Sequence, residues 1–229
     1  MSRTAFPDPT AAVSPAPRLT PKDAATLIVV DRTDGRLRVL FGRRGERHVF
    51  MPNLYVFPGG RRDRGDHALP YTHDLHPQVL ARLAAGRTDP AALRRGRALA
   101  LAAVRELREE TGLHIGRLSD GDTAADLASL RYVARAITPP GNVRRFDTRF
   151  FLTFTDEAGI DPQHVRDSAE LHDLTWLDIE ASSGLNMPLI TRTILEDVVG
   201  RIKADPCLPF GSPGPFYYSR RGHTFRGDI

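Results

Sequence analysis

The stretch RELREETGL (residues 105–113) ends a run of helix-forming residues and closes on Gly112, a common helix stop. On a helix, Glu106 and Glu110 stand one turn apart on the same face, with Glu109 beside them. Carboxylates at the C-terminal end of a helix repel one another and oppose the helix dipole. Converging carboxylates are typical ligands of hard divalent cations, so the stretch indicates a metal site. The alternative is a solvated acidic helix end.

Strands and helices alternate around this stretch. Residues 23–31 and 36–42 are rich in strand-forming residues, and Asp34-Gly35 between them is a hairpin signal. The segment LYVFPGG (54–60) predicts a short strand that ends at two glycines, where the backbone can approach a ligand closely. Further strands are predicted at 131–138, 147–155 and 171–178, and helices at 77–86, 91–111 and 186–205. This order predicts an α/β protein with a mixed sheet and helices on its faces.

The charge of the chain is carried by arginine. The formal net charge is +4, and Lys22 and Lys203 are the only lysines. Arginine favours bidentate pairing with carboxylate or phosphate, so an anionic small-molecule ligand is one reading and a mixed, solvated surface is the other. Nucleic acid is not expected as a partner, because 28 acidic residues are interspersed with the basic ones.

The ends and the cysteine content suggest a compartment. Cys207 is the only cysteine, so no intrachain disulfide can form. No apolar run approaches the roughly 20 residues of a membrane span, and the N-terminus lacks the apolar core of a secretory signal. We therefore expect a cytoplasmic protein that does not bind membranes. Residues 1–22 are rich in Pro, Ala and Ser, which predicts a flexible tail; a transit peptide is the alternative.

RELREETGL resembles the second half of the Nudix box, Gly-x5-Glu-x7-Arg-Glu-U-x-Glu-Glu-x-Gly-U, where U is aliphatic. A contiguous first half is absent, because Ala91 stands where Gly belongs and Arg97 where Glu belongs. The upstream FPGG (57–60) supplies the glycine, and Asp66 then occupies the Glu position. Gly60 and Arg105 are 45 positions apart where the uninterrupted pattern has 14, which predicts an insertion of 45 − 14 = 31 residues within about 67–97. This helical insertion contains the segment predicted as a short helix.

A box split in this way resembles the acyl-CoA diphosphatase-like branch of the Nudix superfamily. The segments similar to that branch are 50–60, 138–151, 168–178 and 186–195, so the resemblance covers roughly 23–200. It implies a Nudix fold over 23–205, in which a mixed sheet is sandwiched between helices, followed by a C-terminal extension over 206–229. The stricter CoA-pyrophosphatase signature is not met, because Asn53 takes a Gly place and Val49 an Arg place.

The resemblance implies hydrolysis of a pyrophosphate linkage in a nucleoside diphosphate joined to another moiety, with Mg²⁺ or Mn²⁺. CoA or an acyl-CoA is one substrate candidate. The alternatives are an ADP-ribose, NADH or nucleotide-sugar type of diphosphatase, or a module that senses a nucleotide without cutting it. A homodimer, with the insertion as its interface, is also open.

The resemblance also implies roles for individual residues. The metal ligands would be Glu106 and Glu110, with Glu109 as a further ligand or as the base and the carbonyl of Gly59 as an added contact. Arg105 would steady Glu109 by a salt bridge four residues along the helix. Asp66 is a weaker candidate, because the insertion can displace it.

Later segments supply the remaining candidates. Glu170 is expected as a distal acidic ligand or base, against plain surface placement. Arg144 and Arg145 are expected to grip phosphate, with Asp147 as an alternative partner for one of them. Arg44, which follows a strand near FPGG, is the third arginine that is expected to bind phosphate. The aromatic run 216–218 either covers an adenine or packs the end of the chain on the domain, and packing is favoured.

Overall fold

The computed structural model describes residues 19–45, 53–119, 122–179, 184–220 and 223–229. Most of the predicted tail, and Val49 with the start of the 50–60 segment, lie outside these residues. The strands are β1 (Lys22–Asp31), β2 (Arg38–Arg44), β3 (Tyr55–Val56), β4 (Gly59–Arg61), β5 (Tyr71–His73), β6 (Gly116–Ser119), β7 (Asp122–Asp126), β8 (Arg131–Ile137), β9 (Phe146–Phe154), β10 (Leu171–Asp178), β11 (Pro215–Arg220) and β12 (His223–Asp228). The helices are α1 (Pro77–Leu83), α2 (Pro90–Thr111), α3 (Thr155–Ala158) and α4 (Leu189–Ala204), with 3-10 turns η1 (Arg64–Ala68) and η2 (Pro162–His164). Among the described helices, none has the length and apolar character needed to cross a bilayer.

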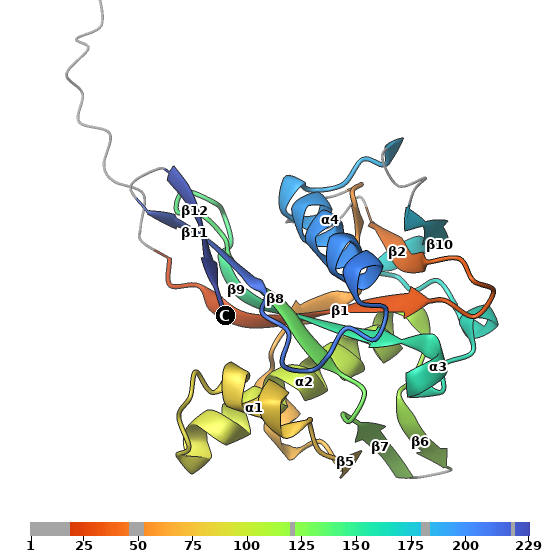
Figure 1. Cartoon of the computed structure of the whole chain (residues 1–229), viewed down its shortest axis with the longest axis horizontal. Coiled ribbons are helices and arrows are strands. Elements are labelled where there is room, and N and C mark those ends of the chain that lie inside the picture. The colour runs from red at the N-terminus through yellow and green to blue at the C-terminus, as the bar shows by residue number, and fades with distance from the viewer. Residues whose placement is uncertain (1–18, 46–52, 120–121, 180–183, 221–222) are drawn as a thin grey trace, which may run out of the picture.

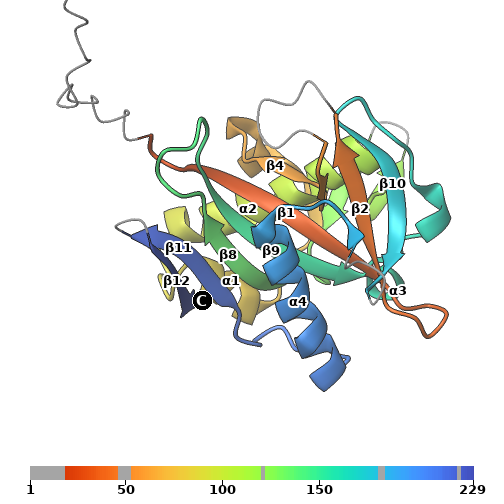
Figure 2. The ribbon, with the colours of Figure 1, turned by 90° about the horizontal axis from the view of Figure 1, so that it is seen from above.

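A nine-stranded mixed sheet forms the centre of the molecule, in the order β10-β2-β1-β9-β8-β11-β12, with β3 beside β2 and β4 beside β1. Helices α1 and α2 cover one face and α4 covers the other (Figures 1 and 2). Successive side chains of β1 alternate between these layers: Leu27 belongs to the core under α2, and Ile28 belongs to the core under α4. The predicted mixed sheet between helices is confirmed.

Helix α2 carries the acidic stretch, and its ends follow from the sequence. Asp89 caps the first turn by accepting the Ala92 N–H at 3.0 Å, and Pro90 occupies the first helical position. Gly112 ends the helix with a left-handed φ of 73°. Gly96, an unusual residue inside a helix, lies where an added Cβ would be 3.2 Å from Leu80 of α1, so it allows the two helices to approach closely.

A small second sheet, in the order β5-β7-β6, flanks α2 and was not predicted. It joins residues 71–73, inside the predicted insertion, to the hairpin that follows α2. Arg97 helps to hold this region, because its guanidinium binds both carboxylate oxygens of Asp74 at 2.7–2.9 Å. Arg97, which occupies a Glu position of an uninterrupted box, therefore connects α2 to the segment between the two box halves.

The last part of the chain adds two strands to the main sheet. β11 pairs in parallel with β8, and β12 pairs with β11. Tyr217 is buried and donates its hydroxyl to Asp197 of α4, while Phe216 and Tyr218 contact each other with ring centroids 4.9 Å apart. These contacts favour the packing role of this aromatic run.

Asp23 joins the start of β1 to α2, to β9 and to the turn that follows β4. Its carboxylate accepts bonds from Arg95 of α2 at 2.6 and 2.8 Å and from Arg149 of β9 at 3.1 Å, and Arg62 lies 3.4 Å away. Burial alone would raise the pKa of Asp23, but the bond to Arg95 and the charges of the three arginines outweigh it and lower the pKa. The ionised carboxylate thus stabilises the folded state.

Asp23→Asn is expected to reduce the free energy of unfolding by about 2–3 kcal/mol at neutral pH, because it leaves buried Arg149 with fewer partners. The pKa of Asp23 is lower in the folded protein than in the unfolded chain. The ionised carboxylate therefore adds its full contribution to the free energy of unfolding above the unfolded-state pKa, and this contribution is lost as the pH falls through the folded-state pKa. The difference between the two proteins should therefore shrink in strongly acidic solution. Urea unfolding at several pH values measures this, with the exposed Asp228→Asn as control; a pH-independent difference would contradict the electrostatic explanation.

Candidate metal site

The turn Pro58-Gly59-Gly60 lies directly against the C-terminal half of α2. The turn is fixed to β1, since the Leu27 N–H donates to the Pro58 carbonyl at 2.9 Å and β4 pairs antiparallel with β1. The Gly59 N–H donates to Glu110 Oε2 at 2.8 Å. Folding therefore brings FPGG and RELREETGL together, as the sequence predicts, although they are far apart along the chain.

Both glycines of the turn are required by close contacts. A Cβ at Gly60 would lie 2.3 Å from Glu106 Oε1, and a Cβ at Gly59 would lie 2.6 Å from the Ala25 carbonyl oxygen. Any side chain at Gly60 would occupy the space of the Glu106 carboxylate. The turn and this glutamate thus fit each other only when the turn carries no side chains.

Arg105 connects the acidic residues of the site. Its guanidinium donates to Asp66 at 2.7 Å and to both Glu106 and Glu109 at 2.9 Å. It also reaches the Arg61 carbonyl at 3.2 Å. Burial would lower the pKa of Arg105, but the bond to Asp66 and the neighbouring carboxylates raise it, so the guanidinium stays charged.

Asp66 supports Arg105. It is 2% exposed, and besides Arg105 it accepts the Asp63 N–H at 2.6 Å, which fixes the η1 turn. The sequence counts Asp66 as a weaker metal candidate; in the structure its carboxylate oxygens are taken up by these donors. The salt bridge between Arg105 and Glu109 is confirmed, whereas the links from Arg105 to Asp66 and to Glu106 were not foreseen.

Glu106 and Glu110 form a poorly compensated pair of carboxylates. Burial raises the pKa of Glu110 to about 8, and the charges of Glu106 and Glu170 act in the same direction against the Gly59 N–H and Arg44. Burial also raises the pKa of Glu106, with Arg105 opposing it. A cation between these groups would relieve both the burial cost and the repulsion.

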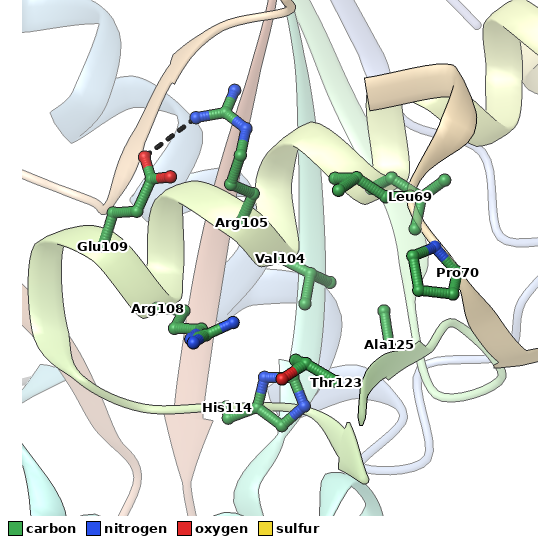
Figure 3. Close-up of a pocket in the computed structure, with 10 residues that line it drawn as sticks. Leu69, Pro70, Val104, Arg105, Arg108, Glu109, His114, Thr123 and Ala125 are labelled. Carbon is green, nitrogen blue, oxygen red and sulfur yellow. Dashed lines mark hydrogen bonds and ion pairs between the residues drawn. The ribbon is translucent and has the colours of Figure 1, made fainter. Parts of the chain in front are cut away.

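Glu109 does not join this pair. Its side chain is 58% exposed and lies toward Arg105 (Figure 3). Within the described ranges, no three His, Cys, Asp or Glu side chains are already placed to hold a metal ion. One nitrogen of Arg105, Nη1, donates to both Glu106 and Glu109, so the Glu109 carboxylate is held on the Arg105 side of Glu106, and its role as a third metal ligand stays a prediction. The oxygen donors of Glu106 and Glu110, one carboxylate partly buried and one buried, both with raised pKa values and both beside the glycine turn, fit a hard divalent cation.

Arg44 and Glu170 lie near the carboxylate pair. Arg44 ends β2 opposite Leu171 of β10, and Glu170 immediately precedes that strand. Burial lowers the pKa of the Arg44 guanidinium, while the charges of Glu110, Glu106 and Glu170 raise it. The structure thus brings both predicted residues to the site, with Glu170 exposed at its edge.

Arg144 and Arg145 lie in the connection between β8 and β9. Arg145 donates to the backbone carbonyls of Thr138 at 3.0 Å and Leu19 at 2.7 Å. Asp147, considered as an alternative partner for one of the two arginines, instead pairs with Arg135 and Arg149, because these side chains share its face of the sheet. Phosphate binding by Arg144 or Arg145 stays a prediction.

Comparisons with known proteins agree with this geometry. The NUDIX domain family model matches residues 76–197, just over half of the chain. The chain is similar to a NUDIX hydrolase from Alicyclobacillus acidocaldarius, with 26% identity and a TM-score of 0.56 over 79% of this chain and 92% of the other. It also shares its fold with the NUDIX domain of Shewanella oneidensis NrtR complexed with ADP ribose, with 14% identity and a TM-score of 0.51 over 84% and 95%.

Proposed function

The chain belongs to the NUDIX domain family of hydrolases, and on this premise we propose that it hydrolyses the pyrophosphate linkage of a nucleoside diphosphate joined to a second moiety, with Mg²⁺ or Mn²⁺. The observation that carries the proposal is the pair formed by buried Glu110 and partly buried Glu106, both against the Gly59-Gly60 turn. Two carboxylates that repel each other and lose hydration destabilise the folded protein, but their oxygen atoms are suitable ligands for a divalent cation.

The residues around Glu106 and Glu110 have separate roles in positioning the carboxylates and in holding the cation. When bound, the cation neutralises phosphate charge and lowers the pKa of an attacking water. Arg105, itself held by Asp66, fixes the positions of Glu106 and Glu109. The two carboxylates of Glu106 and Glu110 would hold the cation, with the Gly59 carbonyl as a further oxygen.

Arg44 and Glu170 take part from the other side of the site. The partly buried Arg44 guanidinium offers charge-assisted bonds to phosphate oxygens. Glu170 is exposed at the edge of the site, where a carboxylate can accept the proton of an attacking water. We keep Glu109 as the second candidate for that base, because its outward carboxylate is reached by solvent.

The second moiety of the substrate separates the candidate activities. CoA and acyl-CoA follow from the sequence resemblance, and ADP-ribose, NADH and nucleotide sugars are the alternatives. A nucleotide-sensing module without catalysis is disfavoured, since Glu106, Glu109 and Glu110 are all present on α2.

A substrate panel tests the proposal. We expect at least one of acyl-CoA, CoA, ADP-ribose, NADH, dinucleoside polyphosphates and oxidised nucleoside triphosphates to be cleaved with Mg²⁺ or Mn²⁺, and cleavage to stop when EDTA removes the metal. Product analysis by chromatography identifies the bond that is broken. If folded protein turns over no member with either metal, the proposed activity is wrong.

A further inference from the structure

A cavity of about 370 Å³ lies between α2, the small sheet and the segment that follows η1 (Figure 3). Helix α2 lines it with Leu101, Val104 and Arg108, whose spacing of three and four positions puts them on one side of the helix. Glu106 and Glu110 lie on the other side of α2, and neither of them lines the cavity. The cavity is therefore separate from the metal site.

The inner part of the cavity is apolar. Its floor consists of Leu101, Val104 and Ala125, which are 2%, 3% and 7% exposed. A cavity of about 150 Å³ can hold benzene, so the larger space here has room for a ring with a short chain attached. Arg108, in contrast, is exposed, which places a positive charge at the rim.

Arg108 is available to a ligand. The other arginine of the lining, Arg105, is engaged by three carboxylates. Among the residues that the structure describes, the Arg108 side chain has no hydrogen-bond or ion-pair partner. Figure 3 shows it directed toward His114 and away from Glu109, whose carboxylate is bound to Arg105. The N–H donors of Arg108 can therefore form charge-assisted bonds with an anion at the rim.

His114 lies at the same end of the cavity. Both of its ring nitrogens are buried and lack a hydrogen-bond partner among the described residues. Burial lowers the pKa of His114, and the charge of Arg108 acts in the same direction, against the backbone groups of Arg117 and Ala124. A negative charge beside Arg108 would offset its repulsion of the protonated ring. This end of the cavity is thus suited to an anion and not to a cation.

We propose that this cavity is a second ligand site, distinct from the metal site, and that it binds a small organic anion. The apolar part of the ligand lies on the floor, and its carboxylate or phosphate group lies on Arg108. The inference goes beyond the proposed hydrolysis and does not depend on it, because neither Glu106 nor Glu110 contributes to the cavity.

The test compares probes that carry both parts of such a ligand with probes that carry one. 4-Phenylbutyrate and 4-phenylbutyl phosphate have a ring and an anionic group, 4-phenylbutan-1-ol has the ring alone, and acetate has the charge alone. Binding to the full chain is measured by NMR titration in Mg²⁺ and again in EDTA. We expect both phenylbutyl anions to bind at least about tenfold more tightly than the alcohol and than acetate, with or without Mg²⁺.

Two matched substitutions on α2 locate the anionic group. Arg108→Gln should weaken binding of both phenylbutyl anions by about tenfold and leave binding of the alcohol unchanged. Arg94→Gln, at an exposed arginine of the same helix that does not line the cavity, should keep the preference for the anions. The bound probe should shift the methyl signals of Val104 and leave those of Val198, in the core under α4, unchanged.

Several results would overturn the proposal. Equal affinity for the anions and the alcohol, or a preference that survives in Arg108→Gln, would show that Arg108 does not hold the anionic group. Equal affinity for acetate and 4-phenylbutyrate would mean that an exposed arginine attracts any anion and that the cavity is not used. Binding that requires Mg²⁺ would place the anion at the metal site, and failure of every probe to bind would leave the cavity without a ligand of this class.

Discussion

Glu110→Gln is expected to lower kcat by about 10²-fold or more and to leave the fold intact. Glu110 is 7% exposed, and its carboxylate faces Glu106 with only Arg44 and the Gly59 N–H to offset the charge. Glutamine keeps the shape and can still accept the Gly59 N–H, but it removes the negative charge that a divalent cation needs. Steady-state kinetics over a range of Mg²⁺ and Mn²⁺ concentrations measures the loss.

Two readouts make this experiment decisive. Thermal unfolding should show that Glu110→Gln is at least as stable as the unmodified protein, because burying an amide costs less than burying a carboxylate. Glu196→Gln, an exposed substitution of the same type on α4, should keep full activity. Activity of Glu110→Gln equal to that of the unmodified protein would mean that the metal is held elsewhere.

Gly60→Ala is expected to reduce kcat/KM by about 10²-fold, although it adds only a methyl group outside α2. That methyl group would lie 2.3 Å from Glu106 Oε1 and 2.4 Å from its carboxyl carbon, so the carboxylate has to move. A shift of about 1 Å in a group that positions the reacting atoms is enough for a loss of this size. Kinetics with the best substrate of the panel measures it.

Gly65→Ala is the matched control, since nothing lies within 4 Å of a Cβ at that position in the neighbouring η1 turn. We expect its kinetics to equal those of the unmodified protein. If Gly60→Ala also retains full activity and a normal melting temperature, Glu106 does not need its observed position, and its assignment as a ligand is wrong.

The main elements were predictable because their signals are local. Helix α2 has a capping aspartate, a proline at its first position and a glycine at its end, and the structure places it at Pro90–Thr111 against a predicted 91–111. The small sheet was missed for the converse reason. Its strand β7 has the sequence DTAAD, which has no strand-forming pattern of its own, so the strand depends on pairing with residues distant in sequence.

In the candidate site, too, contacts within one helix were predictable and contacts between distant segments were not. The contact from Arg105 to Glu109 follows from helix geometry and was predicted. The contact from Arg105 to Asp66 depends on how the η1 turn folds back onto α2, a distance of 39 positions along the chain, and no local signal encodes it. Because that turn directs Asp66 onto Arg105, the arginine is fixed where it donates to both Glu106 and Glu109.

The parallel pairing of β1 with β9 also constrains how the protein folds. Lys22 pairs with Phe146, 146 − 22 = 124 positions later, and the pairing continues to Val30 and Phe154. Contacts between such distant segments form slowly, because a long loop has to close before they contribute stability. During synthesis, β1 therefore emerges well before its central partner, with apolar side chains on both faces and an open edge. The nascent chain should depend most on chaperone protection in the interval before β9 is available.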